Sequence, residues 1–366
     1  MKMTINVTDK CNMNCDYCFR GKDKGRSATF DIIKAAIAMS MASDRSTSIN
    51  FFGGEPLIER ALIEETLNYA RSLHLETKHN FYFRITTNGT LVDEDLLRTA
   101  QKHRLLIAVS HDGLMLESGR KYIGNTELDE NKLRLILSYQ PFASVLSVVT
   151  PKEVGKFAES VEWLFDLGFR NLFPSPQYGK HADWDKSSLA VLKKEYKKIA
   201  TLYKNWTKSG AKFYLGPFEE KILSHIKGED YVAERCNLGK DHLTIAPDGR
   251  IYPCVQFADD ERFYMGNVFE GIDKDVQEKF SAKRIVPDGC SNCAIKNRCR
   301  HTCGCLNKQE TGDINQVSPM QCRHEQILIK TVDVMAEQLY RSKNQRFLRK
   351  HYDPYYPIIS IIEDLK

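Results

Sequence analysis

The stretch CNMNCDYC at residues 11–18 decides the fold class, because it sets three cysteines directly behind a short β-branched run at residues 4–8. We predict that this run is a buried parallel strand, so that the cysteines lie on the loop at its carboxyl end. In a reducing compartment, a C-x3-C-x2-C spacing favours cluster ligands over disulfides. Cys11, Cys15 and Cys18 can supply three of the four iron positions of a [4Fe-4S] cube, which leaves one iron open for chemistry.

The same alternation of strand, turn and helix recurs from residue 3 to about residue 175. The predicted strands are residues 4–8, 48–52, 81–86, 105–110, 143–149 and 171–174. The helical patterns between them cover residues 29–41, 57–73, 93–103, 130–139 and 156–167. Six such units predict an α/β fold, a partial (β/α)6 barrel of TIM type, whose active site lies at the carboxyl ends of the strands.

The composition is that of an ordinary globular protein, with 42% hydrophobic and 28% charged residues, which argues against disorder and fibrous repeats. A net charge of +5 over 366 residues is too small to indicate nucleic-acid binding. The longest apolar stretch, residues 355–362, contains a proline and is much shorter than the roughly 20 residues of a membrane span. Because the sequence also starts without a secretory signal, we expect a cytoplasmic protein with no membrane contact.

Two motifs at neighbouring strand ends resemble those of the radical S-adenosylmethionine (SAM) enzymes. The cysteine spacing, with the aromatic Tyr17 before the last cysteine, is similar to the signature of that family. The stretch FFGGEP at residues 51–56 closes the second predicted strand and resembles the segment that binds the amino group of SAM. Gly53 and Gly54 allow close backbone approach, and Glu55 can accept charge-assisted hydrogen bonds from an ammonium group.

Polar residues also end the third and fourth predicted strands, in TTNGT at residues 86–90 and VSHDG at residues 109–113. By the same resemblance we assign Asn88 and Ser110 to SAM contact, with Asp112 as a further candidate. The resemblance implies a [4Fe-4S] cluster whose open iron holds SAM, and a 5'-deoxyadenosyl radical that abstracts hydrogen from a substrate. The cofactor then carries the difficult chemistry, and the barrel binds it, orients it and excludes water.

A second set of cysteines follows residue 235, and it resembles the SPASM extension of radical SAM enzymes. The resemblance rests on Gly249 between the first two cysteines and on the C-x2-C-x5-C-x3-C spacing at residues 290–303. It implies two auxiliary [4Fe-4S] clusters. By position, the first would be held by Cys236, Cys254 and Cys303, and the second by Cys290, Cys293, Cys299 and Cys322.

The first auxiliary cluster lacks an evident fourth ligand, because no cysteine lies between Cys18 and Cys236. Either its iron is open, for example to a substrate thiolate, or another residue reaches it. Cys305 is that ligand, a hydrogen donor that quenches a substrate radical, or a bystander. Structural zinc is the alternative for residues 290–322, since C-x2-C pairs also suit a tetrahedral thiolate site. We interpret the neighbouring His301 as an exposed loop residue rather than a ligand.

The pattern predicts four segments, namely a radical SAM core barrel at 1–185, a helical connector at 186–235, a SPASM auxiliary-cluster domain at 236–323 and a C-terminal helical tail at 324–366. The connector carries a lysine-rich helix pair that is typical of a solvated surface. The stretch LTIAPDGRIYPC at residues 243–254 predicts a hairpin that turns at Asp248-Gly249. A last helix, predicted over residues 324–350, ends in basic residues that suit a solvated face or an acidic partner peptide.

SPASM enzymes most often act on peptides or proteins. The resemblance therefore implies a maturase that abstracts hydrogen from a ribosomally made peptide and closes a C-C or C-S cross-link. Peptide epimerisation is the alternative in that class. A sulfatase-maturing, formylglycine-forming activity is disfavoured, because Val255 and Gln256 stand where those relatives carry an aspartate. From other classes, an iron-sulfur electron-transfer protein without substrate chemistry and a small-molecule dehydrogenase or mutase are the competing hypotheses.

The implied partners are a precursor peptide or protein substrate and an electron donor such as flavodoxin or ferredoxin. No winged-helix domain for leader-peptide binding precedes the first predicted strand. We therefore expect that a separate leader-peptide-binding protein holds the peptide, or that the barrel and the basic tail hold it directly. The sequence assigns no catalytic base.

Overall fold

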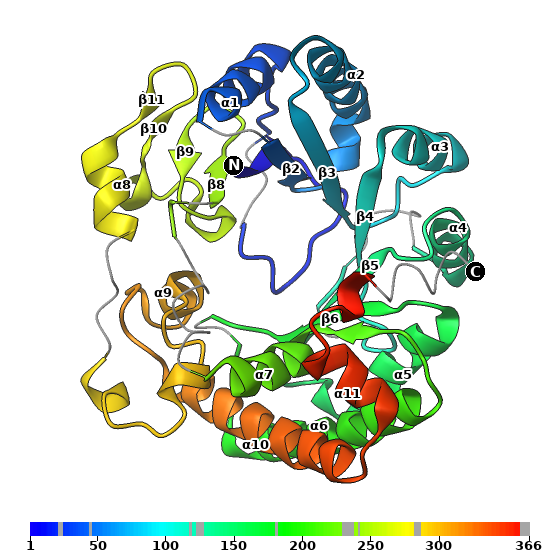
Figure 1. Cartoon of the computed structure of the whole chain (residues 1–366). Helices are drawn as coiled ribbons and strands as arrows, with labels where there is room; N and C mark the ends of the chain where they lie inside the picture. Colours follow the sequence, from blue (N-terminus) through cyan, green and yellow to red (C-terminus); the bar gives the residue numbers. More distant parts are fainter. Residues whose placement is uncertain are drawn as a thin grey trace.

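An open, curved sheet of mostly parallel strands lies at the centre of the molecule in the computed structural model, and helices lie outside much of it (Figure 1). The structure describes residues 1–20, 25–43, 46–116, 119–121, 128–179, 182–228, 238–240, 242–281 and 287–358. Within these residues the main sheet has nine strands in the order β7-β6-β5-β4-β3-β2-β1-β8-β9.

The first six strands run parallel in sequence order, as the repeated βα pattern predicts. They are β1 (Lys2–Thr8), β2 (Ser46–Gly53), β3 (Asn80–Thr87), β4 (Leu105–Ser110), β5 (Ser144–Val149) and β6 (Asn171–Pro176). The register sets their carboxyl ends beside one another, so that Thr8 lies opposite Gly53 and Thr87 opposite Val109. The predicted partial (β/α)6 barrel is confirmed, and the polar strand ends share one edge.

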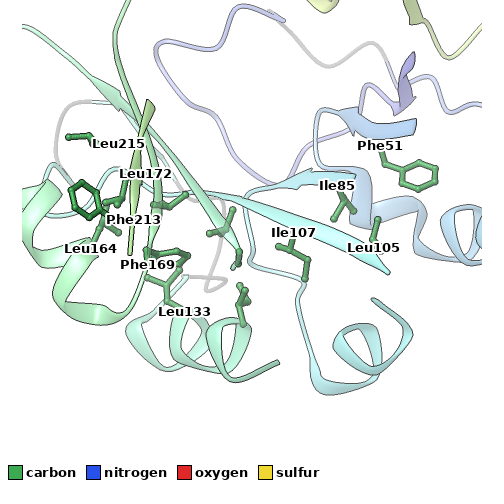
Figure 2. Close-up of a cluster of buried hydrophobic side chains, with 14 of the residues drawn as sticks. Phe51, Ile85, Leu105, Ile107, Leu133, Leu164, Phe169, Leu172, Phe213 and Leu215 are labelled. Carbon is green, nitrogen blue, oxygen red and sulfur yellow. The ribbon is translucent and has the colours of Figure 1, made fainter. Parts of the chain in front are cut away.

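Helices cover the outer face of these strands (Figure 1). They are α1 (Phe30–Ser43), α2 (Arg60–Thr77), α3 (Glu94–His103), α4 (Glu130–Tyr139) and α5 (Phe157–Leu167). Asp93 and Asp129 cap α3 and α4 by accepting a hydrogen bond from a backbone N–H in the first turn. The core lies between strands and helices, and Figure 2 shows Ile85, Ile107 and Leu133 within it. Each such side chain contributes about 1.5–3 kcal/mol when fully buried, so the core fixes the strand ends.

The connector, predicted as a helix pair, contains a strand as well. It consists of α6 (Lys186–Lys208), β7 (Tyr214–Leu215) and α7 (Gly216–Lys227). β7 pairs in parallel with β6, which places Tyr214 opposite Asn171. Phe213 packs edge-on against Phe165 and Trp206 and so directs the chain back to the sheet. The prediction of two helices is confirmed, whereas a strand of two residues is too short to show a periodicity.

The sheet continues into the cysteine-rich segment. β8 (His242–Ile245) pairs in parallel with the free side of β1, and β9 (Ile251–Tyr252) pairs antiparallel with β8. Gly249 takes a φ of 85° in the turn, so the predicted hairpin is confirmed. The smaller elements that follow are β10 (Gly266–Asn267), β11 (Gly271–Ile272), α8 (Lys274–Ser281) and α9 (Gly304–Thr311).

The C-terminal helix predicted over residues 324–350 is instead two helices, α10 (Pro319–Arg341) and α11 (Gln345–Tyr352). The prediction of one helix is wrong because Lys343 takes a φ of 51° and the Asn344 side chain caps α11. At the basic end, Lys350 donates to the Phe213 carbonyl at 2.7 Å and pairs with Glu219. None of the helices in the described part of the chain combines the length and apolar character that a membrane crossing needs.

Candidate radical SAM active site

The cysteine loop after β1 is held between two backbone segments. On one side the Glu55 N–H donates to the Lys10 carbonyl at 2.8 Å. On the other side the Asp16 N–H donates to the Gly119 carbonyl at 2.8 Å. The structure therefore places three predicted ligands on a braced loop at the carboxyl ends of β1 and β2, and these are Cys11, Cys15 and Cys18.

The three thiols of this loop interact electrostatically. Burial raises the pKa of Cys11 to about 11, and the charges of Glu55, Cys15 and Cys18 add to the rise. Burial also raises the pKa of Cys15, against the opposing charge of Arg120. Among the described residues, no three Cys, His, Asp or Glu side chains meet at ion-binding distances. Because a cluster ligand must be a thiolate, cationic iron would have to offset this burial, and an all-thiol donor set suits a [4Fe-4S] cluster.

Gly53 and Gly54 bring the end of β2 against the cysteine loop. A Cβ on Gly53 would lie 2.2 Å from the Thr8 carbonyl oxygen, and one on Gly54 would lie 2.2 Å from the Lys10 carbonyl oxygen. Gly53 also has a φ of 148°, which other residues rarely adopt. The close approach expected of these glycines therefore occurs between two backbone segments of the chain itself.

Glu55 is fully buried and is braced by three hydrogen-bond donors. Its Oε1 accepts from the Leu57 N–H at 3.0 Å and from Thr87 Oγ1 at 2.7 Å, and its Oε2 accepts from the Asn88 N–H at 2.7 Å. Burial raises the pKa of Glu55, while these hydrogen bonds oppose the rise. Oε2 takes a single hydrogen bond from the described residues, so it keeps capacity for an ammonium donor.

Asn88 connects the end of β3 to the cysteine loop. Its Nδ2 donates to Asn12 Oδ1 at 2.8 Å, and its Oδ1 accepts from Thr90 Oγ1 at 2.7 Å. Asn12 Nδ2 donates in turn to Thr90 Oγ1 at 2.8 Å, which closes a small polar ring. Sequence reasoning selected Asn88 but missed Asn12, although its position inside the cysteine motif was an available signal.

Tyr17 and Asp112 link the cysteine loop to the ends of β4 and β5. The Tyr17 hydroxyl donates to Asp112 Oδ2 at 2.5 Å, and the Val148 N–H donates to Asp112 Oδ1 at 2.8 Å. Arg120 Nε lies 3.4 Å from the same carboxylate. Both oxygens of Asp112 are therefore engaged within the chain, which makes it a brace of the loop. Ser110, at the end of β4, is half-buried.

His111 carries a prediction about pH. Its Nδ1 accepts a hydrogen bond from the Gly113 N–H at 3.0 Å, its ring stacks on Trp163, and burial lowers its pKa to about 4. An unfolded imidazole has a pKa of about 6.5, so between these values the unfolded chain binds the extra proton. The free energy of unfolding should therefore fall as the pH drops from about 6.5 to 4, by up to about 1.4 kcal/mol per pH unit from this residue.

The matched variant is His111→Asn, whose Oδ1 can replace Nδ1 as acceptor without titrating. Urea unfolding of both proteins at several pH values measures the difference. We expect the advantage of the wild type over the variant to shrink as the pH falls. Parallel stability curves for the two proteins would contradict the assignment.

The predicted ligands of the second auxiliary cluster interact with one another. Burial raises the pKa of Cys290, and the charges of Cys322 and Cys293 add to it. Burial raises the pKa of Cys299 to about 12, with a smaller contribution from Cys322. Cys322 lies in the first turn of α10, so the start of this helix is next to the site.

Of the first auxiliary set, Cys236 lies outside the described residues. Cys254 follows β9, and Cys303 precedes α9. The sulfur atoms of Cys303 and Cys305 are 3.3 Å apart, and this contact, followed by burial, raises the pKa of Cys303. Cys305 is therefore close enough to Cys303 to be a ligand of the same cluster.

The prediction that His301 is exposed is wrong, because only 4% of its surface is accessible. Asn307 Nδ2 donates to the carbonyls of His301 and Ile314, both at 2.9 Å. These bonds tie α9 to the loop that carries the buried imidazole.

A partial barrel with a three-cysteine loop at its strand ends and a second group of thiols suits an iron-sulfur enzyme. Comparison with protein families identifies which kind. The model of the radical SAM superfamily matches residues 5–140, and that of SPASM, an iron-sulfur cluster-binding domain, matches residues 236–305. The chain therefore belongs to the radical SAM superfamily and carries a SPASM domain.

Curated relatives include enzymes of two kinds. The chain is 23% identical over 369 residues to the radical SAM cyclopropyl synthase TigE of Paramaledivibacter caminithermalis, covering 92% of this chain and 74% of that protein. It is 23% identical over 334 residues to a cysteine-type anaerobic sulfatase-maturating enzyme of Clostridium perfringens, covering 83% of this chain and 89% of that enzyme. An uncharacterized protein of Methanocaldococcus jannaschii is 29% identical over 174 residues, which span 46% of this chain and only 60% of that protein.

Among solved structures, the fold is similar to that of anSMEcpe with bound AdoMet and Cp18Cys peptide. The TM-score is 0.77 at 18% identity, and the alignment covers 92% of this chain and 99% of that one. At this identity the likeness concerns the fold, and it spans barrel, connector and cysteine-rich segment together.

Proposed function

We propose that the chain is a radical SAM/SPASM maturase that abstracts hydrogen from a ribosomally made peptide and closes a C-C or C-S cross-link. The observation that carries the proposal is the braced three-cysteine loop, which shares one strand edge with Glu55 and Asn88. When bound there, a [4Fe-4S] cluster and SAM would supply a 5'-deoxyadenosyl radical. The surrounding strand ends would hold the reactants in line and keep water out.

The chain's own residues have distinct tasks in this proposal. Cys11, Cys15 and Cys18 would hold the cluster, and Glu55, whose Oε2 accepts a single hydrogen bond from the described residues, would accept from the ammonium group of SAM. Tyr17 steadies the loop through Asp112, as described above. Two auxiliary [4Fe-4S] clusters would bind the second set of cysteines, namely Cys236, Cys254, Cys290, Cys293, Cys299, Cys303 and Cys322.

The cross-linking reaction is supported by the similarity to TigE, which is named a cyclopropyl synthase, and a peptide substrate by the similarity to a structure with bound peptide. Peptide epimerisation remains the alternative on the same site. Formylglycine formation is disfavoured, because Val255 and Gln256 stand where those relatives carry an aspartate, and the Gln256 side chain contacts Gln309. A flavodoxin or ferredoxin would supply electrons, and a separate leader-binding protein would complete the system if the barrel alone does not hold the peptide.

The test uses the full chain, reconstituted anaerobically with iron and sulfide and incubated with SAM, a reductant and candidate precursor peptides deuterated at side chains and α-carbons. We expect deuterium in 5'-deoxyadenosine and a peptide product lighter by two hydrogens. Transfer in which the peptide only exchanges one deuterium for one hydrogen, with no net loss of two hydrogens, would favour epimerisation. An electron-transfer protein would release neither 5'-deoxyadenosine nor methionine, and transfer from a small alcohol but from no peptide would overturn the peptide proposal.

A further inference from the structure

A groove of about 660 Å³ runs between α6 and α10, which lie side by side in the lower part of Figure 1. The Tyr196 hydroxyl is 2.7 Å from His324 Nε2, and Lys204 Nζ donates to Gln338 Oε1 at 2.8 Å. These two contacts show that the helices run in the same direction along the groove. The groove lies apart from the strand ends that carry the cysteine loop and Glu55.

All the charged side chains that line the groove are positive among the described residues. Lys193, Lys197 and Lys204 come from α6, and Arg323 and Lys330 come from α10, whereas no Asp or Glu of the described residues lines the groove. Among the described residues none of these five side chains has a carboxylate within ion-pair distance. Lys198, one position along α6 and outside the groove, does pair with Glu195 at 2.6 Å. The five cations therefore repel one another, with no acidic partner in the part of the chain that the structure describes.

The floor of the groove is apolar. Ala200 lies on the α6 side, and Ile327, Val334 and Met335 lie on the α10 side. Val334 is 53% exposed, whereas the next residue, Met335, is buried. Along α10 the lining residues recur every three to four positions from Arg323 to Gln338, a length of about 22 Å. This length and pattern match one face of a helix of about four turns.

We propose that this groove binds an amphipathic helix of a separate, acidic peptide chain. The apolar face of that helix would cover Ile327 and Val334, and its Glu and Asp side chains would pair with the flanking lysines and Arg323. An apolar stripe flanked by charge is how helices are recognised in grooves, with anchors at three- and four-residue spacing. The apolar floor favours a helix over a nucleic-acid backbone, which would need cations along the whole contact. The inference goes beyond the proposed reaction and does not depend on it.

The test measures binding by fluorescence anisotropy on the full-length, cluster-loaded chain. The probe is a labelled synthetic helix of about 18 residues with leucines at helical spacing and glutamates on both flanks. One control peptide has lysine in place of every glutamate, and a second has the same composition in scrambled order. We expect saturable binding of the acidic helix alone, and weaker binding as the salt concentration rises.

The variant Lys197→Glu/Lys330→Glu should weaken binding at least about tenfold, because it replaces attraction with repulsion on both walls. Val334→Ser should weaken binding about fivefold, because it removes apolar contact area from the floor of the groove. Lys194→Glu, an exposed change of the same charge on α6 outside the groove, is the matched control and should leave binding within about twofold. Each variant is first shown to have the wild-type melting temperature and iron content.

Three results would overturn the proposal. The first is equal binding of the acidic, basic and scrambled peptides, or of none. The second is displacement of the acidic helix by a short RNA or DNA duplex with a lower dissociation constant, which would identify the groove as a phosphate-binding surface. The third is a Lys197→Glu/Lys330→Glu variant that still binds the peptide normally but is no longer reduced by an acidic electron-carrier protein. The binding assay needs no turnover. A failure of the proposed reaction can therefore be distinguished from a failure of helix binding.

Discussion

Replacing Cys15 with alanine should abolish reductive cleavage of SAM. The loop offers three thiols to a cluster that needs all of them, and burial already opposes the ionisation of Cys11 and Cys15. Since removal of an outer-shell partner alone costs about 10–100-fold at metal sites, loss of a ligand should lower 5'-deoxyadenosine formation by at least about 100-fold. The measurements are 5'-deoxyadenosine by chromatography and iron per chain, both on anaerobically reconstituted protein.

Cys305→Ala is the matched control for this experiment, because Cys305 is also half-buried but belongs to the other group of thiols. We expect it to keep SAM cleavage while the Cys15 variant loses it. Unchanged cleavage in Cys15→Ala would remove the basis of the proposed active site. Loss of iron in Cys305→Ala, with SAM cleavage retained, would identify Cys305 as the fourth ligand of the first auxiliary cluster.

Replacing Glu325 with alanine should destabilise the protein by about 3–5 kcal/mol, because it removes the carboxylate from a buried ion pair with Lys221. Lys221 Nζ lies 2.5 Å from Glu325 Oε2, and the two side chains are 0% and 2% exposed. Lys221 also donates to the Arg298 carbonyl at 3.1 Å, and the Arg300 N–H donates to Glu325 at 3.1 Å. The pair therefore clamps both sides of Cys299, a predicted cluster ligand.

The double variant Lys221→Met/Glu325→Leu separates charge from packing, since replacing both partners of a buried ion pair with apolar residues often costs little. We expect it to regain most of the stability that Glu325→Ala loses, as measured by urea unfolding at equal iron content. Equal losses in the single and double variants would show that the pair acts through shape alone. A loss below about 1 kcal/mol in Glu325→Ala would contradict the burial of the pair.

The barrel could be predicted from sequence because each unit carries its own signal. Residues 105–110 and 130–139 were predicted with the bounds of β4 and α4, since a buried strand and an amphipathic helix differ in period. Pairing between distant segments leaves no such signal. The contact of β8 with β1 joins residues about 240 positions apart, and the burial of His301 depends on how α9 folds back.

The same distinction applies to the site. The thiols and Glu55 were recognisable because their motifs are local, whereas the partner of Tyr17 lies 95 residues away. Thr87 and Asn12 are ordinary residues in sequence, and only the meeting of three strand ends makes them braces of Glu55 and Asn88. Side chains that carry chemistry could thus be predicted, but those that hold them in place could not.

The placement of β8 beside β1 has a consequence for any shortened form of the chain. β1 is buried from Met3 to Thr8, and β8 occupies main-chain donors and acceptors along the edge of β1 that faces away from β2. A truncated barrel that ended before residue 236 would expose them as an unprotected sheet edge, which is a template for aggregation. β8 of the cysteine-rich segment therefore protects that edge. Insolubility of an isolated barrel would reflect the loss of β8 rather than a defect in the cysteine loop.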